Sequence, residues 1–398
     1  MVPDTIRSEV DRHLSVQLLQ DQHIQRIQAA MEEHQSSQTR RSLLARALRL
    51  SPSISPKECE IVDHCCSVLD VETEVELYVY SGSEMNAGCT QPEDGRVFIL
   101  VSSSLLESFE HDELCFVVGH ELGHHIYSHH SIPLSFLLAN HQNLPPQLVL
   151  LAHRWQRHAE VSADRAGIAC VGRLDPVARA FFKLSSGLRS APGPAQIQAF
   201  IDQAEELYQV DQETEGSDRT RHRDWLSSHP FAPVRLRTAQ AFIQSEVITS
   251  GGRSMSEVEA TVEEIMQLME PSYLEEDSPS AENMRRLLFA AAIVVADSSE
   301  VVSTEECQAL VDLLGCAAVP ITLDAERLAE VLPERIELVK TSVPMGRRVL
   351  LVRDLTLIAR ADGHIQPSEI KVIEKIASDL DVSPEIVWTT FEGSTELD

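Results

Sequence analysis

Aromatic and basic side chains are both scarce in this sequence. Aromatics make up 5% of its 398 residues, so we expect cores built mainly from Leu, Val, Ile and Ala. Its 33 Lys and Arg residues are outnumbered by 62 Asp and Glu residues, which gives a formal net charge of −29. Because nucleic acids and anionic membrane surfaces both bind clusters of cations, this charge argues against either as a partner.

Long apolar runs are missing as well. The longest, such as residues 287–296, have about half of the roughly 20 residues that a membrane-spanning helix needs. The start of the chain carries Asp4, Glu9 and Asp11 without the apolar segment of a secretion signal. These absences predict a cytoplasmic protein with no membrane insertion.

The eight cysteines form no Cys-x-x-Cys pair, and a chain of this length has no need of a disulfide framework. We therefore expect reduced thiols throughout, with the adjacent Cys65 and Cys66 packed as small apolar side chains. Hydrophobic residues make up 43% of the sequence, which suits packed globular domains rather than disorder.

Hydrophobic periodicity predicts a mostly helical protein. Apolar residues at helical spacing predict helices at 1–50, 112–130, 148–171 and 229–248, with a basic amphipathic stretch at 40–50. Two segments alternate instead and predict strands, at 75–80 and 96–101. The predicted fold class is therefore α+β, mostly helical, with a small antiparallel or mixed sheet.

An acidic stretch marks the main domain boundary. Residues 255–283 contain nine carboxylates and no Lys or Arg, which is typical of a linker. We divide the chain into an N-terminal helical segment (1–56), a domain with strands and helices (57–252), an acidic helix and linker (253–283) and an all-α domain (284–398).

One predicted helix carries the pattern H-E-x-x-H at residues 120–124. Positions four apart lie on one helix face, so His120 and His124 can bind the same ion. Glu121 lies beside them and can take a proton from a zinc-bound water. The apolar run at 114–118 would bury this helix in a core. We therefore expect one zinc ion per chain, and not merely a helix with clustered surface histidines.

A catalytic zinc needs a third protein ligand, and two candidates follow. His130 has metzincin spacing, but that pattern requires Gly where this chain has Tyr127. We expect the helix to continue there, which carries His130 too far along the axis. Glu160 is the better candidate, because Asp164 lies one helical turn later and can orient a ligand histidine. Ordinary solvated carboxylates are the alternative.

Several segments together resemble the HtpX and CAAX-prenyl-protease family of gluzincin zinc metallopeptidases. They occur in the family's order across about residues 70–245: Asn86-Ala87, the strand Val97 to Val101, Asp112-Glu113-Leu114, His120 to His124, Glu160 to Asp164, and His229-Pro230 with Arg235. The resemblance implies a gluzincin fold for 57–252 with zinc ligands His120, His124 and Glu160.

The same resemblance implies roles for further residues. Glu121 would be the general base, and His229 would stabilise the oxyanion with Arg235 close by. The strand at 97–101 would be the sheet edge that pairs with an extended substrate, so Asn86, Val97 and Ile99 are the substrate-binding candidates. Turn chemistry explains Asn86 equally well, and a salt bridge explains Arg235.

The C-terminal helices are similar to the TerB (tellurite-resistance) domain, through Ala361 to Ile365 and a weaker counterpart at Asp297. This module could bind a metal or a protein partner, although a purely structural turn fits Asp362 as well. The leading hypothesis is a zinc metalloendopeptidase that hydrolyses protein or peptide substrates. The alternative is a catalytically silent or latent zinc protein that acts as a binding module through its helical domains.

Overall fold

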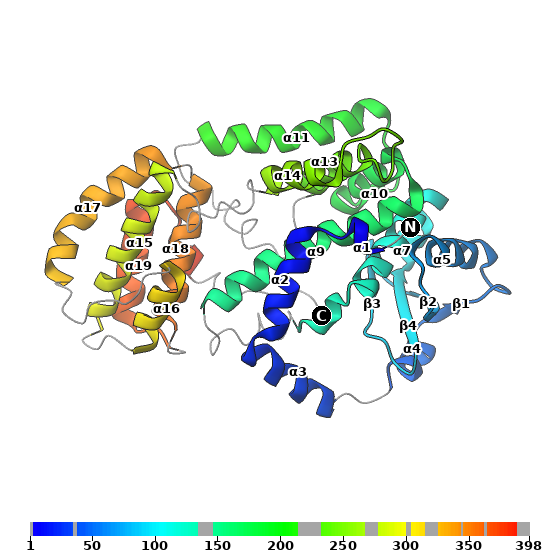
Figure 1. Ribbon diagram of the computed structural model, residues 1–398, viewed down its shortest axis with the longest axis horizontal. Coiled ribbons are helices and arrows are strands. Elements are labelled where there is room, and N and C mark those ends of the chain that lie inside the picture. The colour runs from blue at the N-terminus through cyan, green and yellow to red at the C-terminus, as the bar shows by residue number, and fades with distance from the viewer. Residues whose placement is uncertain are drawn as a thin grey trace. The chain divides into compact units, whose positions relative to one another are not determined.

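Figure 1 shows a computed structural model of the chain. The structure describes residues 3–34, 38–133, 146–213, 232–266, 278–299, 304–314, 325–343, 345–361 and 364–387. These residues fall into two compact units. The first takes in 3–133, 155–205 and 232–266. The second contains the helices from residue 278 onward and the helical ends 146–154 and 206–213.

The first unit contains a four-stranded mixed sheet with the order β1-β2-β4-β3. The strands are β1 (Leu48–Leu50), β2 (Glu74–Tyr80), β3 (Ala87–Cys89) and β4 (Arg96–Ser102). The long strands β2 and β4 run parallel, with Leu77 opposite Ile99, and the two short strands pair antiparallel on either side. A mostly helical α+β fold with a small mixed sheet is confirmed.

The strand β4 does not form an edge of this sheet. It pairs with β2 along its whole length and with β3 at Ile99 to Val101. The expectation that residues 97–101 form the substrate-pairing edge is therefore wrong. A polar turn brings the chain back as β3, a strand too short and too poor in apolar residues to be expected from its sequence. Within the described residues, β3 takes the edge position.

The predicted helix at 40–50 is also shorter than expected. The helix α4 (Thr39–Arg46) ends at Arg46, and residues 48–50 form β1. Leu50 is buried, and Arg49 reaches the carboxylate of Glu76 on β2. Pairing with β2 satisfies the backbone hydrogen bonds of residues 48–50 and buries Leu50. These gains outweigh the helical propensity of this segment, because the helix α4 has no buried residue.

The remaining helices of the N-terminal two thirds of the chain lie in the first unit, except that α9 begins and α11 ends in the second. At the N-terminal side these are α1 (Pro3–Ile6), α2 (Glu9–Gln20), α3 (Gln22–His34), α5 (Pro56–Leu69) and α6 (Ser103–Ser108). They are followed by α7 (His111–Ile126), the short 3-10 helix η1 (His129–Ser131), α9 (Pro146–Val171), α10 (Leu174–Ser186), α11 (Pro194–Glu213), α13 (Ala232–Ile243) and α14 (Met255–Met266). The predicted helix at 148–171 is confirmed by α9.

Two of these helices, α7 and α9, approach each other unusually closely. A Cβ atom added at Gly123 would lie 2.8 Å from the Cα of Ala163, and one added at Gly167 would lie 2.5 Å from the carbonyl oxygen of Phe116. Real Cβ atoms do not tolerate such distances, so the glycines are required for this contact. This close packing sets the spacing of the side chains that the two helices share.

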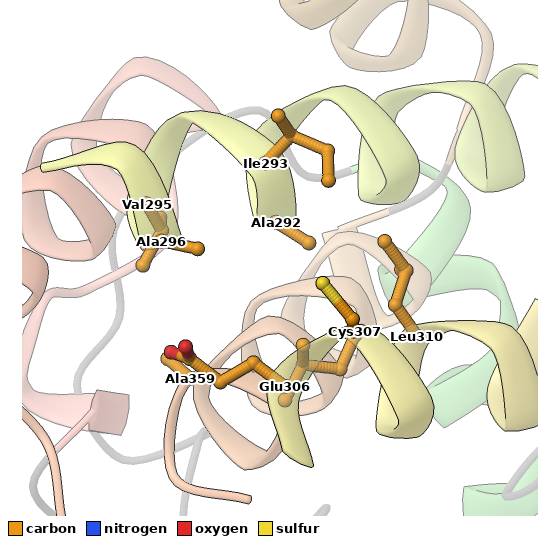
Figure 2. A pocket seen from close by; sticks show the side chains of 9 residues that line it. Ala292, Ile293, Val295, Ala296, Glu306, Cys307, Leu310 and Ala359 are labelled. Carbon is orange, nitrogen blue, oxygen red and sulfur yellow. The ribbon is translucent and has the colours of Figure 1, made fainter. Parts of the chain in front are cut away.

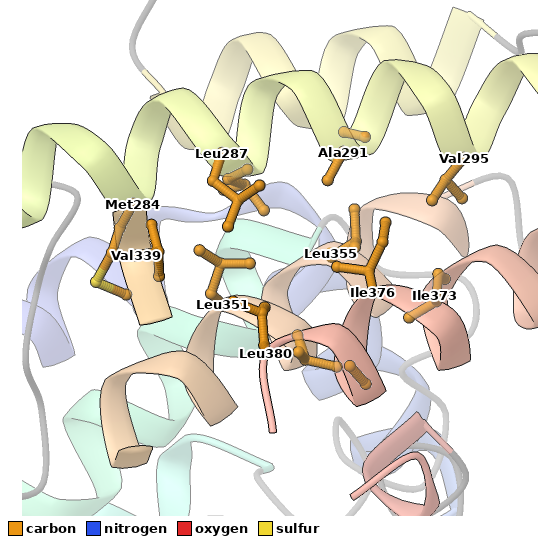
Figure 3. Packing of buried hydrophobic residues seen from close by; sticks show 14 of the residues in the cluster. Met284, Leu287, Ala291, Val295, Val339, Leu351, Leu355, Ile373, Ile376 and Leu380 are labelled. Carbon is orange, nitrogen blue, oxygen red and sulfur yellow. The ribbon is translucent and has the colours of Figure 1, made fainter. Parts of the chain in front are cut away.

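The second unit has its own apolar core. Its helices are α15 (Pro279–Asp297), α16 (Thr304–Leu314), α17 (Ala325–Ser342), α18 (Met345–Ala359) and α19 (Pro367–Asp379). Figure 3 shows Leu287 and Ala291 of α15 facing Leu351 and Leu355 of α18, with Ile376 of α19 beside them. These side chains are fully or almost fully buried.

A small pocket lies in the second unit between α15, α16 and α18 (Figure 2). Its volume is about 10 Å³, which is roughly the room that one water molecule needs. Apolar side chains line most of it, joined by Glu306 and Cys307. A pocket of this size cannot take up a peptide.

The domain division stays a proposal, with one refinement. The helix α14 packs on α13 inside the first unit, and α15 begins at Pro279 in the second. We therefore propose the boundary between Met266 and Ser278, inside the acidic stretch.

Two further observations bear on the composition. The seven cysteines within the described ranges are free thiols: Cys59, Cys65, Cys66, Cys89, Cys115, Cys170 and Cys307. No helix in the described part of the chain combines the length and apolar character needed to cross a membrane.

Candidate metal centre

The helix α7 presents two histidines on one face. Its start is fixed by a capping box, in which the Glu113 carboxylate accepts the Glu110 backbone N–H at 2.9 Å. Its apolar first half is buried, which holds the helix in the core. The rings of His120 and His124 lie 4.8 Å apart, and their Nε2 atoms are separated by 3.1 Å.

Glu160 of α9 completes a three-residue cluster. Its carboxylate lies 3.5 Å from Nε2 of His124 and 3.7 Å from Nε2 of His120. The three possible ligand atoms lie within 4.8 Å of one another. Two imidazoles and one carboxylate are the ligand set of catalytic zinc sites with one open position, so the residues present fit such an ion.

Asp164 lies one turn further along α9, behind His120. Its Oδ1 is 2.9 Å from Nδ1 of His120. Arg235 of α13 holds the same carboxylate with two hydrogen bonds of 2.9 and 2.6 Å, and its guanidinium also lies 3.1 Å from the Glu160 carboxylate. Burial alone would lower the pKa of His120, but the hydrogen bond to Asp164 and the charge of Glu160 raise it.

The helix α7 ends earlier than the sequence predicted. Its last residue is Ile126, and Ser128 adopts a left-handed conformation with φ 56° before η1 begins. The expectation that the helix continues through Tyr127 is wrong, because Ser128 makes the turn instead of a glycine. The metal-ligand cluster of the described residues does not include His130.

This turn places His129, which the sequence analysis did not single out, against a predicted ligand. Nδ1 of His129 lies 2.8 Å from Nδ1 of His124. Burial lowers the pKa of His124 well below its usual value, which favours the neutral imidazole that a metal requires. The sequence signal for this contact was the presence of His129 five residues after His124. Its side chain reaches His124 only because of the turn at Ser128, which the sequence did not predict.

Glu121 is almost fully buried beside the cluster. Burial raises the pKa of its carboxyl group to about 7. The backbone of Cys89 in β3 acts on this carboxyl group and lowers its pKa, and α7 packs against β3, so the sheet edge and the predicted base are neighbours. A carboxylate with a pKa near neutrality is suited to exchanging protons with water.

The other candidates are distributed as follows. Asn86 precedes β3, and its backbone N–H and C=O both bond Ser102, at 3.1 and 2.8 Å. Val97 and Ile99 are fully buried in β4, so their side chains face the core and not a bound substrate. His229 lies outside the described residues.

Comparison with known proteins agrees with this geometry. Residues 58–243 match the family model described as peptidase family M48. The chain contains an M48 peptidase domain. Residues 285–387 match the model of tellurite resistance protein TerB, so the helices of the second unit form a TerB domain. Both resemblances drawn from the sequence motifs are thereby confirmed.

One curated relative matches the M48 domain. It is the plastoglobule-localized metallopeptidase 48, chloroplastic, of Arabidopsis thaliana, which is 27% identical over 188 residues. The match covers 45% of this chain and 54% of that protein, so the chain spans about half of the relative's length. No solved structure matches the chain.

Proposed function

We propose that this protein is a zinc-dependent metalloendopeptidase that hydrolyses peptide bonds of protein or peptide substrates. One observation carries the proposal: the ligand atoms of His120, His124 and Glu160 converge within 4.8 Å, with the buried Glu121 beside them. The M48 domain supports a peptidase, and peptidase substrates are proteins or peptides.

Each residue of the site has a separate proposed role in the reaction. His120, His124 and Glu160 would hold one zinc ion, which supplies Lewis acidity and acidifies a water. Glu121 is the proposed general base, since its raised pKa lets it accept a proton near neutral pH and later return it to the leaving amine. Asp164 fixes the tautomer and orientation of His120 by accepting its Nδ1–H.

Arg235 is proposed to act through its neighbours. Its guanidinium is held by both oxygens of Asp164 and lies 3.1 Å from Glu160. It therefore positions the carboxylates that hold and orient the ligands. His229 remains the proposed oxyanion-stabilising residue, on the strength of the family resemblance.

The substrate is proposed to pair with β3 rather than with β4. The Thr90 N–H and the Asn86 C=O bond to β4, so in an antiparallel pair the backbone groups of Ala87 and Cys89 point away from it. Among the described residues no further strand pairs with this side of β3, which lies beside Glu121. An extended peptide that adds to β3 would bring its backbone to the proposed base.

The decisive test is Glu121→Gln. Loss of the general base should lower kcat for an unfolded protein substrate by about 10²–10⁴-fold while zinc stays near one per chain. The matched control is Glu107→Gln, which removes a highly exposed carboxylate of α6 and should leave both quantities unchanged. Undiminished cleavage by Glu121→Gln would remove this residue from the mechanism.

The same assay decides between the two hypotheses. If the full chain binds zinc but cleaves no substrate in a broad screen, the silent or latent binding module is favoured. A protein partner for the TerB domain and a cytoplasmic location stay predictions, to be checked by affinity capture and by fractionation.

A further inference from the structure

The carboxylate of Asp11 is enclosed in the first unit, although α2 lies before the residues that match the M48 family. Asp11 is 0% exposed. It accepts a hydrogen bond from Nε1 of Trp155 at 3.0 Å and one from the hydroxyl of Ser162 at 2.7 Å, both from α9. Nε2 of His129 lies 3.2 Å from its Oδ2.

An arginine also holds this carboxylate. Arg7 donates to Oδ2 at 2.8 Å and to Oδ1 at 3.1 Å, and its guanidinium lies over the ring of Tyr127. Burial alone would raise the pKa of Asp11, but its bonds to His129 and Arg7 hold that pKa well below the usual range. Asp11 is therefore a buried anion whose carboxylate has four side-chain partners: Arg7, His129, Trp155 and Ser162.

The hydrogen-bond directions connect this anion to the metal ligand. When Nε2 of His124 binds a metal, the remaining proton of the neutral ring lies on Nδ1. His124 then donates to Nδ1 of His129, 2.8 Å away. With Nδ1 accepting, the proton of neutral His129 lies on Nε2 and is donated to Asp11.

The Nδ1 atoms of the two predicted ligand histidines are thus each linked to a carboxylate that an arginine holds. Nδ1 of His120 meets Asp164 directly, and Arg235 holds that carboxylate with two bonds. Nδ1 of His124 meets Asp11 through His129, and Arg7 holds that carboxylate with two bonds. In each case, an arginine-held carboxylate fixes the tautomer of one ligand.

We propose that Asp11 is a positioning residue of the metal centre, acting through His129 to orient the ligand His124. This inference rests on the proposed zinc site. It makes the N-terminal helix α2 part of the centre rather than a covering segment.

A purely structural role predicts something different. The Ser8 backbone N–H bonds the hydroxyl of Ser162, and apolar residues such as Leu14 bury α2 as well. If Asp11 only anchored α2, its loss would lower stability, as loss of Leu14 would. Zinc affinity and the ligand field would then be unaffected.

The test compares Asp11→Asn with Leu14→Ala in the full chain. Zinc affinity is measured by competition with a chromophoric chelator, and the ligand field by the visible spectrum of the cobalt(II)-substituted protein. Asp11→Asn should weaken zinc binding about 10- to 100-fold and shift the cobalt bands. Leu14→Ala should lower the unfolding temperature with zinc affinity and cobalt bands unchanged.

Two variants of His129 keep the test decisive if Asp11→Asn fails to fold. His129→Gln retains an acceptor for His124 and a donor for Asp11, whereas His129→Leu removes both. Near-native affinity and cobalt bands in the first, with a 10- to 100-fold loss in the second, support the inference. Equal affinities and unchanged cobalt bands in all folded variants overturn it. Failure of the unmodified chain to bind zinc would instead overturn the proposed function.

Discussion

Several buried carboxylates among the described residues are paired with arginines, and Glu76 shows what such a residue contributes away from the candidate metal centre. It lies on β2, where Arg40 of α4 donates three hydrogen bonds to it and the Tyr78 hydroxyl donates a fourth at 2.6 Å. Arg49 of β1 adds a fifth. Glu76 thus joins the N-terminal segment to the sheet.

Glu76→Gln should destabilise the first unit in a pH-dependent way. Burial raises the pKa of Glu76, but its bonds to Arg40 and Tyr78 outweigh this and lower it. Stability gained from a lowered pKa is present above the unfolded value and is lost as the pH falls through the folded value. The variant should lose about 1 kcal/mol or more near pH 7, and the deficit should shrink below about pH 4.5.

Denaturant titrations at a series of pH values measure this deficit. The control is Glu74→Gln on the same strand, whose carboxylate is 59% exposed and pairs with Arg96 at 3.1 Å. Exposed pairs contribute little, so this variant should match the parent at every pH. A deficit of Glu76→Gln that is independent of pH would contradict the expected ionisation.

At this scale, residue spacing alone predicted only those pairs that lie within one helical turn, and Arg235 was found only through the family resemblance. His120 and His124, or Glu160 and Asp164, are recognisable because four residues return a side chain to the same face. Asp11 and His129 are 118 residues apart in the sequence. Their contact depends on the left-handed backbone conformation of Ser128, which the local sequence does not predict. Such residues become visible only when the fold is known.

At the scale of elements, helix spacing and strand order position the centre. The close contact of α7 and α9 depends on small residues, because a Cβ atom at Gly123 or Gly167 would collide with the other helix. Strand order could not be derived in this way. The apolar β4 fits an inner or an edge strand equally well, and β3 has only three residues.

The proposed pairing edge is tested by Ala87→Pro. Its N–H points away from β4, so proline removes a donor to the substrate without breaking the ladder. We expect kcat/KM for an unfolded protein to fall about fivefold, the value of one hydrogen bond, with an unchanged unfolding temperature.

Gly88→Pro provides the matched control one residue along. Gly88 stands opposite Leu100 in a hydrogen-bonded pair, so its N–H faces β4. This variant should lose stability as well as activity. Full activity of Ala87→Pro would mean that substrates do not use this edge.

At the scale of the whole molecule, the chain combines two units with separate cores. The candidate ligands His120, His124 and Glu160 all belong to the first unit, whereas the core around Leu287 and Leu355 belongs to the second. Anything that binds only the folded first unit should stabilise that unit alone.

Calorimetry of the full chain should show two unfolding transitions. Removing zinc with a chelator should therefore lower the temperature of the transition that belongs to the first unit. The transition of the TerB domain should keep its temperature, and adding zinc back should restore the other. In the variant His124→Ala, the first unit should unfold at the temperature of the zinc-free parent, whether or not zinc is added. A single transition that shifts as a whole would contradict separate units.

The shortest strand has a consequence for how this chain can be divided. The three residues of β1 cover Leu77 to Val79 of β2, and they lie before residue 58, where the family match begins. A fragment cut at that point would leave all seven residues of β2 as a bare outer strand. Bare strands of this length pair with copies of themselves. The segment that looks dispensable by family boundaries therefore also guards the peptidase domain against aggregation.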